Sequence, residues 1–244
     1  MPPRDPPSSA RAGLTDAEIH GRVIGAVQDH RLAPGTKLVE DRLGRAFGVS
    51  RTRIRQVLIR LAQEQIVTLT PNCGATVAQP TVDEAREVFE ARRLIEPVLA
   101  ARVVTHGTPA LLRTLAQNIR AEEAARQRGD RHAEIRLSGE FHLLLAQAAH
   151  HATFERMLSE LVSRTSLVLM AYGRPASTRT LRTRCDCGDH RALLAALKLR
   201  DAQAAGALML THLQALEAGL QFEQPAAPDT DVFANFADEA QDAG

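Results

Sequence analysis

The amino-acid sequence predicts a mainly α-helical protein, with an N-terminal winged helix-turn-helix followed by an all-helical bundle of about six helices. Hydrophobic residues make up 44% of the chain but aromatic residues only 3%, so the core must be built mostly from Leu, Ala, Val and Ile. Such a core favours helices over a β-sandwich. Apolar residues recur at helical spacing through most of the 244 residues. Residues 65–78 are the exception, because β-branched runs there flank an Asn- and Gly-containing loop, which is typical of a hairpin.

Charge is distributed unevenly along the chain. The formal net charge is only +1, but residues 11–80 contain ten basic and six acidic residues. The segment from Glu223 onward contains six acidic residues and no basic one. A basic front end on a nearly neutral protein predicts a local anionic partner. We expect the acidic tail, residues 223–244, to be disordered.

Cysteine usage and hydropathy indicate a cytoplasmic protein. No apolar stretch reaches the length of about 18 residues that a membrane span needs, and the Pro-rich N-terminus lacks the apolar core of a signal peptide. The three cysteines form an odd number without framework spacing, so we expect them to be reduced. Cys185 and Cys187 precede a histidine and could bind a soft metal, although loop residues are the simpler interpretation. Cys73 falls at the tip of the expected hairpin, where an exposed substitution is a simpler explanation than a redox role.

The first expected domain covers residues 14–80, after a Pro-rich segment, residues 1–13, that we expect to be disordered. Thr15 and Glu18 have the spacing of a capping box and predict the start of a first helix. Leu32-Ala33-Pro34-Gly35 is a turn signal that ends it. Residues 37–39 read as a short extended piece, and a second short helix runs from Glu40 to Phe47.

Gly48 stops the second helix, and Ser50 can cap a third. Two short helices joined through a glycine make a helix-turn-helix, and the hairpin that follows it would be a wing. Four residues at i, i+3, i+4 and i+7 give the third helix one apolar stripe: Ile54, Val57, Leu58 and Leu61.

This third helix carries four arginines and no acid: Arg51, Arg53, Arg55 and Arg60. Thr52, Arg55 and Gln56 fall opposite the apolar stripe, with Arg51 at the edge and Arg53 on a flank. A solvated basic helix of an ordinary bundle is the alternative interpretation. The wing and the preceding helices favour a helix that meets phosphates and guanine edges in DNA.

Residues 15–80 resemble the winged helix of the GntR family of bacterial transcription regulators. The resemblance rests on residues 32–40, 48–52, Ile54-Arg55 and 72–75. It implies that operator DNA is contacted by Arg51, Thr52, Arg55 and Gly74. We add three neighbouring candidates: Arg45 as a phosphate contact, Ser50 and Arg53. Arg53 stands where the family usually has proline and Gln56 where it usually has glutamate, so operator sequence and salt dependence are expected to differ from the family norm.

Residues 81–222 read as a second, all-helical domain. Its expected helical stretches are 82–106, 109–128, 132–150, 153–172, 178–184 running towards 189–199, and 201–221. No phosphate-binding loop, dinucleotide fingerprint or nucleophile elbow is present, so we do not expect an enzyme. An internal pocket is the usual functional device of such a bundle.

Three histidines in this domain, His142, His190 and His212, stand in apolar helical surroundings. Each alone could be an ordinary histidine satisfied by hydrogen bonds. Together they resemble the FCD subgroup of GntR regulators, in which an aspartate and three histidines bind a divalent metal such as Zn, Ni or Mn. Here Ser138 replaces the aspartate, and serine is a poor ligand for such metals. Three imidazoles can still hold a metal, or the histidines can bind an anion directly.

Arg92 lies four residues before Glu96, which would ordinarily indicate a surface ion pair. The FCD resemblance implies instead that Arg92 faces the pocket and binds an effector carboxylate. The expected effector site therefore comprises Arg92, Ser138 and the three histidines. The function that follows is a homodimeric, ligand-responsive regulator, most simply a repressor, which binds palindromic double-stranded DNA and senses a small organic acid. A metal-dependent hydrolase with a DNA-binding appendage and a sequence-independent nucleoid protein are the alternatives.

Overall fold

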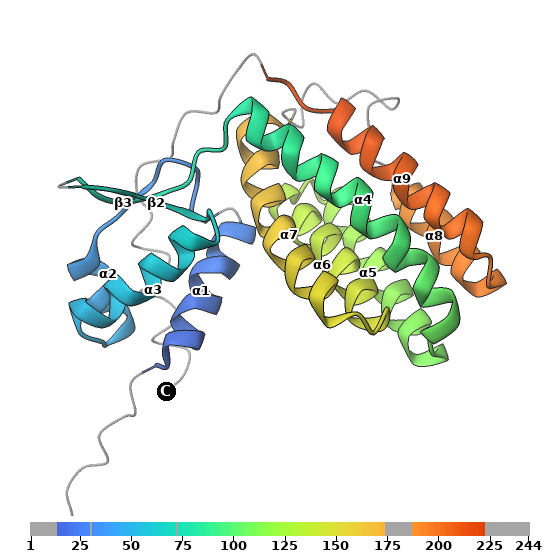
Figure 1. The fold of residues 1–244 in the computed structure, drawn as a ribbon, viewed down its shortest axis with the longest axis horizontal. Helices are drawn as coiled ribbons and strands as arrows, with labels where there is room; N and C mark the ends of the chain where they lie inside the picture. Colours follow the sequence, from blue (N-terminus) through green and yellow to red (C-terminus); the bar gives the residue numbers. More distant parts are fainter. Residues whose placement is uncertain (1–13, 30, 72, 174–186, 223–244) are drawn as a thin grey trace, which may run out of the picture.

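The computed structural model describes residues 14–29, 31–71, 73–173 and 187–222. The termini expected to be disordered, the helical stretch 178–184 and Cys185 lie outside these ranges. The described residues form a small α/β body, which is joined to a larger helical bundle (Figure 1). This arrangement confirms the predicted fold class.

The N-terminal body contains α1 (Asp16–Gln28), β1 (Lys37–Leu38), α2 (Glu40–Phe47), α3 (Arg51–Gln63), β2 (Val67–Thr70) and β3 (Gly74–Val77). The capping box at α1 is present, since the Glu18 amide donates to Thr15 Oγ1 at 3.2 Å and the Thr15 amide donates to a Glu18 carboxylate oxygen at 2.6 Å. Gly48 ends α2 in the left-handed conformation at φ 67°. Ser50 then caps α3 by accepting from the Arg53 amide at 3.4 Å.

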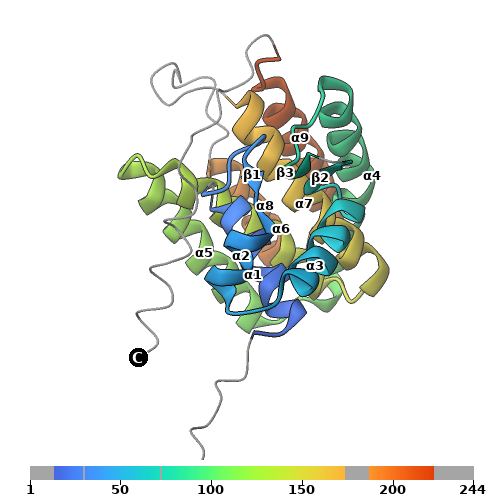
Figure 2. The ribbon, with the colours of Figure 1, turned by 90° about the vertical axis from the view of Figure 1, so that its left-hand side faces the viewer.

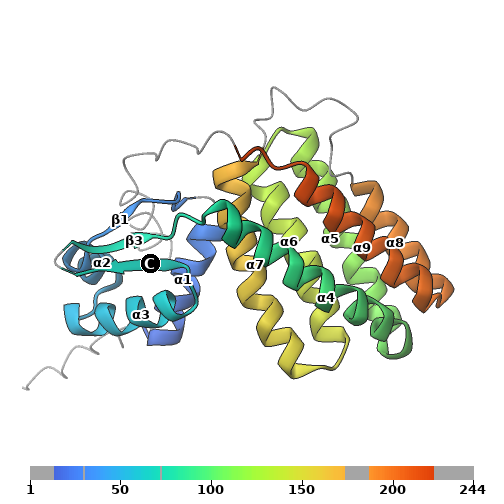
Figure 3. The ribbon, with the colours of Figure 1, turned by 45° about the horizontal axis from the view of Figure 1, so that its top comes forward.

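The three strands form one antiparallel sheet in the order β1-β3-β2. Val67 is paired with Val77 and Thr70 with Gly74 across the hairpin. The extended piece expected at residues 37–39 forms an edge strand, in which Lys37 pairs with Thr76. Figure 3 shows this sheet lying along α1, α2 and α3, with which it encloses the N-terminal core.

Six helices form the second body within the described residues: α4 (Val82–His106), α5 (Pro109–Gln127), α6 (Arg131–Ala148), α7 (Ala152–Tyr172), α8 (Cys187–Leu199) and α9 (Ala202–Ala218). α4 and α9 run side by side in Figures 1 and 3. Gly206 of α9 allows this approach, because a Cβ there would lie 3.3 Å from the Pro97 carbonyl oxygen of α4. No described helix is both long enough and apolar enough to cross a membrane.

The two bodies meet mainly through α1 and α7. Leu167 of α7 is buried in the N-terminal core, and Gln28 Nε2 of α1 donates to Ser163 Oγ at 3.3 Å. The Tyr172 hydroxyl donates to the Pro80 carbonyl in the connection between β3 and α4 at 2.7 Å. Figure 2, viewed from the N-terminal side, shows α1, α2 and α3 in front of the bundle.

Candidate functional site

The first candidate site is the outer face of α3. Its buried residues are Ile54, Val57, Leu58 and Leu61. On the opposite side Arg51, Thr52, Arg55 and Gln56 are exposed, and Arg45 in the last turn of α2 is exposed as well. The helical spacing therefore places the expected DNA-contacting side chains in solvent, around a recognition helix whose other face is fixed in the core.

Three of the four arginines on α3 are paired with acidic side chains. The pairs are Arg51–Glu40, Arg53–Asp16 and Arg60–Glu64. Arg51 Nε lies 2.6 Å from Glu40 Oε2, yet 67% of the Arg51 side chain is exposed. Solvent screens an exposed pair of this kind, so the pair stabilises the protein little and a phosphate can compete for the guanidinium. Sequence reasoning considered only acids within α3 and missed partners that come from α1, α2 and the residue after α3.

Arg55 and Arg45 differ from these three arginines. Within the described parts of the chain, neither has a hydrogen-bond or ion-pair partner for its side chain. Arg53, in contrast, is turned towards Asp16 at the start of α1 and would have to leave it to reach DNA. Ser50 already uses its hydroxyl to cap α3. Among these arginines, Arg55 and Arg45 are therefore the ones that need not leave an acidic partner in the described structure before they meet DNA.

The wing hairpin presents Cys73 and Gly74 to solvent. Gly74 has a φ of 91°, in the region that favours glycine. A Cβ at Gly74 would meet nothing within 4 Å, so backbone conformation rather than space requires the glycine. An approaching phosphate can reach this exposed turn, although the Cys73 amide already donates to the Thr70 carbonyl at 3.0 Å.

The second candidate site lies inside the bundle, where His142 of α6, His190 of α8 and His212 of α9 come together. Their exposed fractions are 1%, 2% and 4%. One ring nitrogen of each lies within 4.8 Å of a ring nitrogen of the others. Three histidines that are each satisfied separately would not need to converge, whereas three ligands of one metal ion must do so.

A carboxylate holds the Nδ1 atom of each histidine. The contacts are His142 with Glu96 of α4, His190 with Glu122 of α5 at 2.8 Å, and His212 with Asp189 of α8 at 3.2 Å. A carboxylate on Nδ1 fixes the tautomer that leaves the lone pair of Nε2 for a metal. The Nε2 atoms of His142 and His190 are buried without a hydrogen-bond partner among the described residues. These two orphaned atoms fit a metal ion.

The protonation states also suit metal binding. Burial lowers the pKa of His142 to about 3, which leaves the ring neutral at physiological pH. Burial likewise lowers the pKa of His212. Although burial opposes the ionisation of Glu96, the charge of Arg92 and the hydrogen bonds from His142 and Arg92 lower its pKa to about 2. Neutral imidazoles beside an ionised carboxylate are the forms that a divalent metal requires.

Arg92 is buried in this site and is not a surface residue. Its Nε donates to Glu96 Oε1 at 2.6 Å, and its Nη1 donates to Thr165 Oγ1 at 3.2 Å. Arg92, Ser138 and His142 line a cavity of about 20 Å³, room for about one water molecule. The structure therefore brings all five expected effector residues to one region, but Glu96 already neutralises Arg92.

Sequence reasoning missed the three carboxylates. The sequence did indicate a role for Glu96, because an arginine one turn earlier on an apolar helix can form a buried ion pair with it. Asp189 directly precedes His190 but contacts His212, so its position in the sequence did not indicate which histidine it contacts. Glu122 lies in a charged stretch of α5 that gives no sign of burial.

Comparison with known proteins finds two family matches along the chain. Residues 15–77 match the bacterial regulatory proteins of the gntR family, and residues 87–215 match the FCD domain. The chain is 27% identical to the HTH-type transcriptional repressor RspR of Escherichia coli over 184 residues, 75% of this chain and 78% of that protein.

Two solved structures share the fold. Escherichia coli McbR/YncC superimposes with a TM-score of 0.72 at 21% identity, covering 82% of this chain and 93% of that one. A GntR-type regulator from Rhodococcus sp. RHA1 gives a TM-score of 0.70 at 22% identity, covering 83% and 95%. At these identities the structures support the fold alone.

Proposed function

The chain belongs to the gntR family of bacterial regulatory proteins and carries an FCD domain. From this we propose that it is a homodimeric repressor, which a small organic acid releases from its operator. As a member of this family it is a DNA-binding transcription regulator. The observation that carries the proposal is the union in one chain of an exposed recognition helix and a buried three-histidine centre. The hydrolase and nucleoid-protein alternatives find no support in its relatives.

The proposed DNA contact places α3 in the major groove. Arg51, Thr52 and Arg55 would meet base edges, because they are exposed on the outer face of the helix. Arg45, Ser50, Arg53 and the Gly74 backbone would meet phosphates. An operator for a two-fold dimer contains two half-sites related by the same symmetry. The regulator would act in the cytoplasm, where its operator is found.

Dimerisation is supported by an apolar pair on α4. Leu94 is 72% exposed and Val98 48% exposed, and they lie one turn apart on the same helix face. Two large apolar side chains on one face of a long helix favour burial against another chain. We therefore propose that α4 contributes to the dimer interface through these two residues.

The proposed ligands of a divalent metal are the three histidines, through Nε2. Ser138 does not replace the missing aspartate as a ligand. Each imidazole is instead made more basic by the carboxylate that contacts its Nδ1, from Glu96, Glu122 or Asp189. When bound, such a metal would supply open coordination positions for a carboxylate oxygen. Arg92 and Ser138 line the space beside His142, where the rest of a small acid would be placed.

The size of that space supports a conformational response. A cavity of about 20 Å³ is too small for an organic acid, so the helices around it, which include α6 and α7, would have to move to admit one. α7 also packs against α1 of the winged helix, and such a movement reaches the DNA-binding domain. The acid must favour the state that fits the operator less well, typically by about 1–3 kcal/mol.

Selection of DNA from a random-sequence pool tests this proposal. We expect the bound fraction to converge on a two-fold symmetric sequence, and a screen of small carboxylic acids with Zn, Ni or Mn present to yield a compound that weakens binding about 5–150-fold. Equal affinity for all sequences would favour the nucleoid-protein alternative. Turnover of an ester or amide that is lost in His190→Ala would favour the hydrolase.

A further inference from the structure

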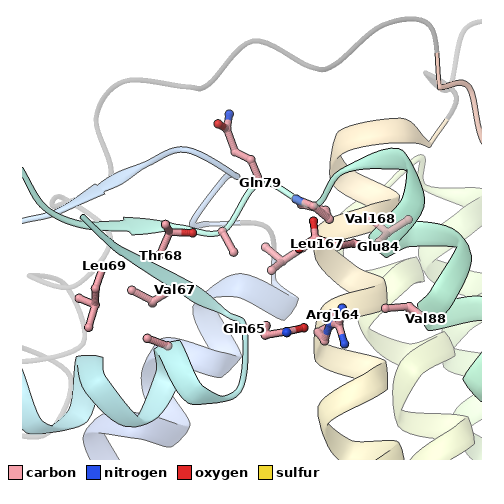
Figure 4. Close-up of a pocket in the computed structure, with 13 residues that line it drawn as sticks. Gln65, Val67, Thr68, Leu69, Gln79, Glu84, Val88, Arg164, Leu167 and Val168 are labelled. Atoms are coloured by element: carbon pink, nitrogen blue, oxygen red, sulfur yellow. The ribbon is translucent and has the colours of Figure 1, made fainter. Parts of the chain in front are cut away.

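A second cavity lies between the two bodies of the protein, away from the histidine centre. Its volume is about 360 Å³, within the range of about 300–1,000 Å³ that small-molecule sites occupy. One wall comes from the end of α3 and from β2, and the opposite wall from α4 and α7 (Figure 4). Ala78, Gln79 and Pro80, which connect β3 to α4, close one end.

Contacts on either side fix the position of this cavity. On one side α1 packs on α7, with Leu167 buried in the N-terminal core. On the other side, the Tyr172 hydroxyl at the end of α7 donates a hydrogen bond to the Pro80 carbonyl at 2.7 Å. A molecule in the cavity would touch both bodies and the connection between them.

Arg164 of α7 provides a positive charge at this interface. It is half-buried, and in the described structure its guanidinium has neither a hydrogen-bond nor an ion-pair partner. Glu84 also lines the cavity, but its carboxylate accepts from the Thr81 amide at 2.6 Å and caps α4. An unpaired, partly desolvated guanidinium is a ready partner for a carboxylate, which it can bind through two parallel hydrogen bonds.

Gln65 lies beside Arg164 and approaches it from the opposite wall (Figure 4). Gln65 follows α3 with a φ of 58°. Its backbone amide donates to the Ala62 carbonyl at 3.1 Å, and the backbone amide of Ile66 donates to the Leu61 carbonyl at 3.0 Å. This pairing is a helix-ending motif whose left-handed position usually holds glycine. Gln65 places an amide side chain in the cavity from a position where glycine would be less strained.

The rest of the lining is largely apolar. It includes Val67, Leu69, Pro80, Val88, Leu167 and Val168. Val67, Val88, Leu167 and Val168 are buried, whereas Leu69 is 43% exposed and Pro80 is partly exposed, so these last two leave apolar surface for a ligand to cover. We propose that this cavity is a second small-molecule site, for an amphipathic carboxylate whose anionic group binds Arg164 and Gln65 and whose apolar body packs on β2 and the connection.

The site is distinct from the histidine centre but shares α7 with it. Arg164 and Val168 face the interdomain cavity, whereas Thr165 and Ser166 line the small cavity beside His142. A ligand at Arg164 would join the winged helix to the helix that also borders the histidine centre. Neither the site nor its ligand class rests on the proposed function.

Calorimetric titration with octanoate tests the site. We expect wild-type protein to bind octanoate, and Arg164→Gln to weaken that binding about tenfold or more by removing the charge-assisted hydrogen bonds. Gln65→Gly should also weaken it while leaving the thermal midpoint unchanged or higher, because glycine relieves the left-handed strain. Octan-1-ol, which has the same chain without the charge, should bind at least about tenfold more weakly than octanoate.

Two matched variants locate the binding. Arg156→Gln removes an exposed arginine from the same helix that lines neither cavity, and His190→Ala disrupts the histidine centre. Both should bind octanoate as wild type does. The proposal is overturned if folded wild-type protein does not bind octanoate. It is equally overturned if His190→Ala abolishes binding while Arg164→Gln retains it, since octanoate would then occupy the histidine centre.

Discussion

Charged side chains are paired in both halves of this molecule, but the pairs differ in their surroundings. On α3 the Arg51–Glu40 pair is exposed, with 67% of the arginine side chain in solvent. In the bundle the Arg92–Glu96 pair is 2% and 1% exposed and also holds His142. An exposed pair can exchange its acid for a phosphate, whereas a buried pair cannot be opened without stranding a charge. The first arrangement suits transient binding of DNA, and the second suits a fixed ligand set.

Breaking the buried pair should have the largest effect. Glu96→Ala leaves Arg92 charged and without its carboxylate in the core, which we expect to lower the free energy of unfolding by about 3–5 kcal/mol. Denaturant titration measures the loss. Glu140→Ala is the matched control. Glu140 is exposed, and its contact with Arg136 on the same helix is long, at 3.7 Å, so its loss should cost little stability. Equal stability of the two variants would contradict the buried role of Glu96.

Removing an exposed arginine should affect DNA and not stability. Arg55→Ala is expected to weaken operator binding by about 1–3 kcal/mol, because Arg55 faces outward and has no protein partner in the described structure. Its thermal midpoint should stay that of wild type. Arg60→Ala serves as the control, since Arg60 lies late on α3 and pairs with Glu64. Fluorescence anisotropy at fixed salt compares them, and equal affinities would refute the assignment of Arg55.

The carboxylates behind the histidines should tune metal affinity. Glu122→Gln keeps the size of the side chain but removes the charge that polarises His190 at 2.8 Å. We expect divalent-metal affinity to fall about 10–100-fold, measured by competition with a chelating dye. Glu123→Gln alters the neighbouring residue, which pairs with exposed Arg191, and should leave metal affinity unchanged. A similar loss in both variants would contradict a specific role for Glu122.

Opening the exposed pair should have the smallest effect on stability. Glu40→Gln frees Arg51, and we expect the free energy of unfolding to stay close to that of wild type, because solvent screens this pair. Operator affinity should rise, because Arg51 no longer has to leave an acid before it meets DNA. A plot of affinity against salt concentration checks this. Weaker binding at every salt concentration would mean that Glu40 positions Arg51 for DNA.

The local pattern of the sequence was sufficient to predict the fold. Thr15, Gly48 and Ser50 cap or end helices through short-range bonds, and periodicity alone identified the buried face of α3. Pairing across the chain was not predictable in this way. Glu122 reaches a histidine 68 residues away, and Asp16 reaches Arg53 from another helix. Such contacts depend on how helices pack, which no single stretch of sequence encodes.

The most direct test of the histidine centre is the metal content of purified, dialysed protein, measured by elemental analysis beside His190→Ala. The convergence of three buried histidines predicts about one equivalent of Zn, Ni or Mn in wild type and its loss in the variant. Absence of metal from both, with each protein folded, would contradict the metal centre. The buried Nε2 atoms of His142 and His190 would then have to accept hydrogen bonds from water or from a donor group of the effector.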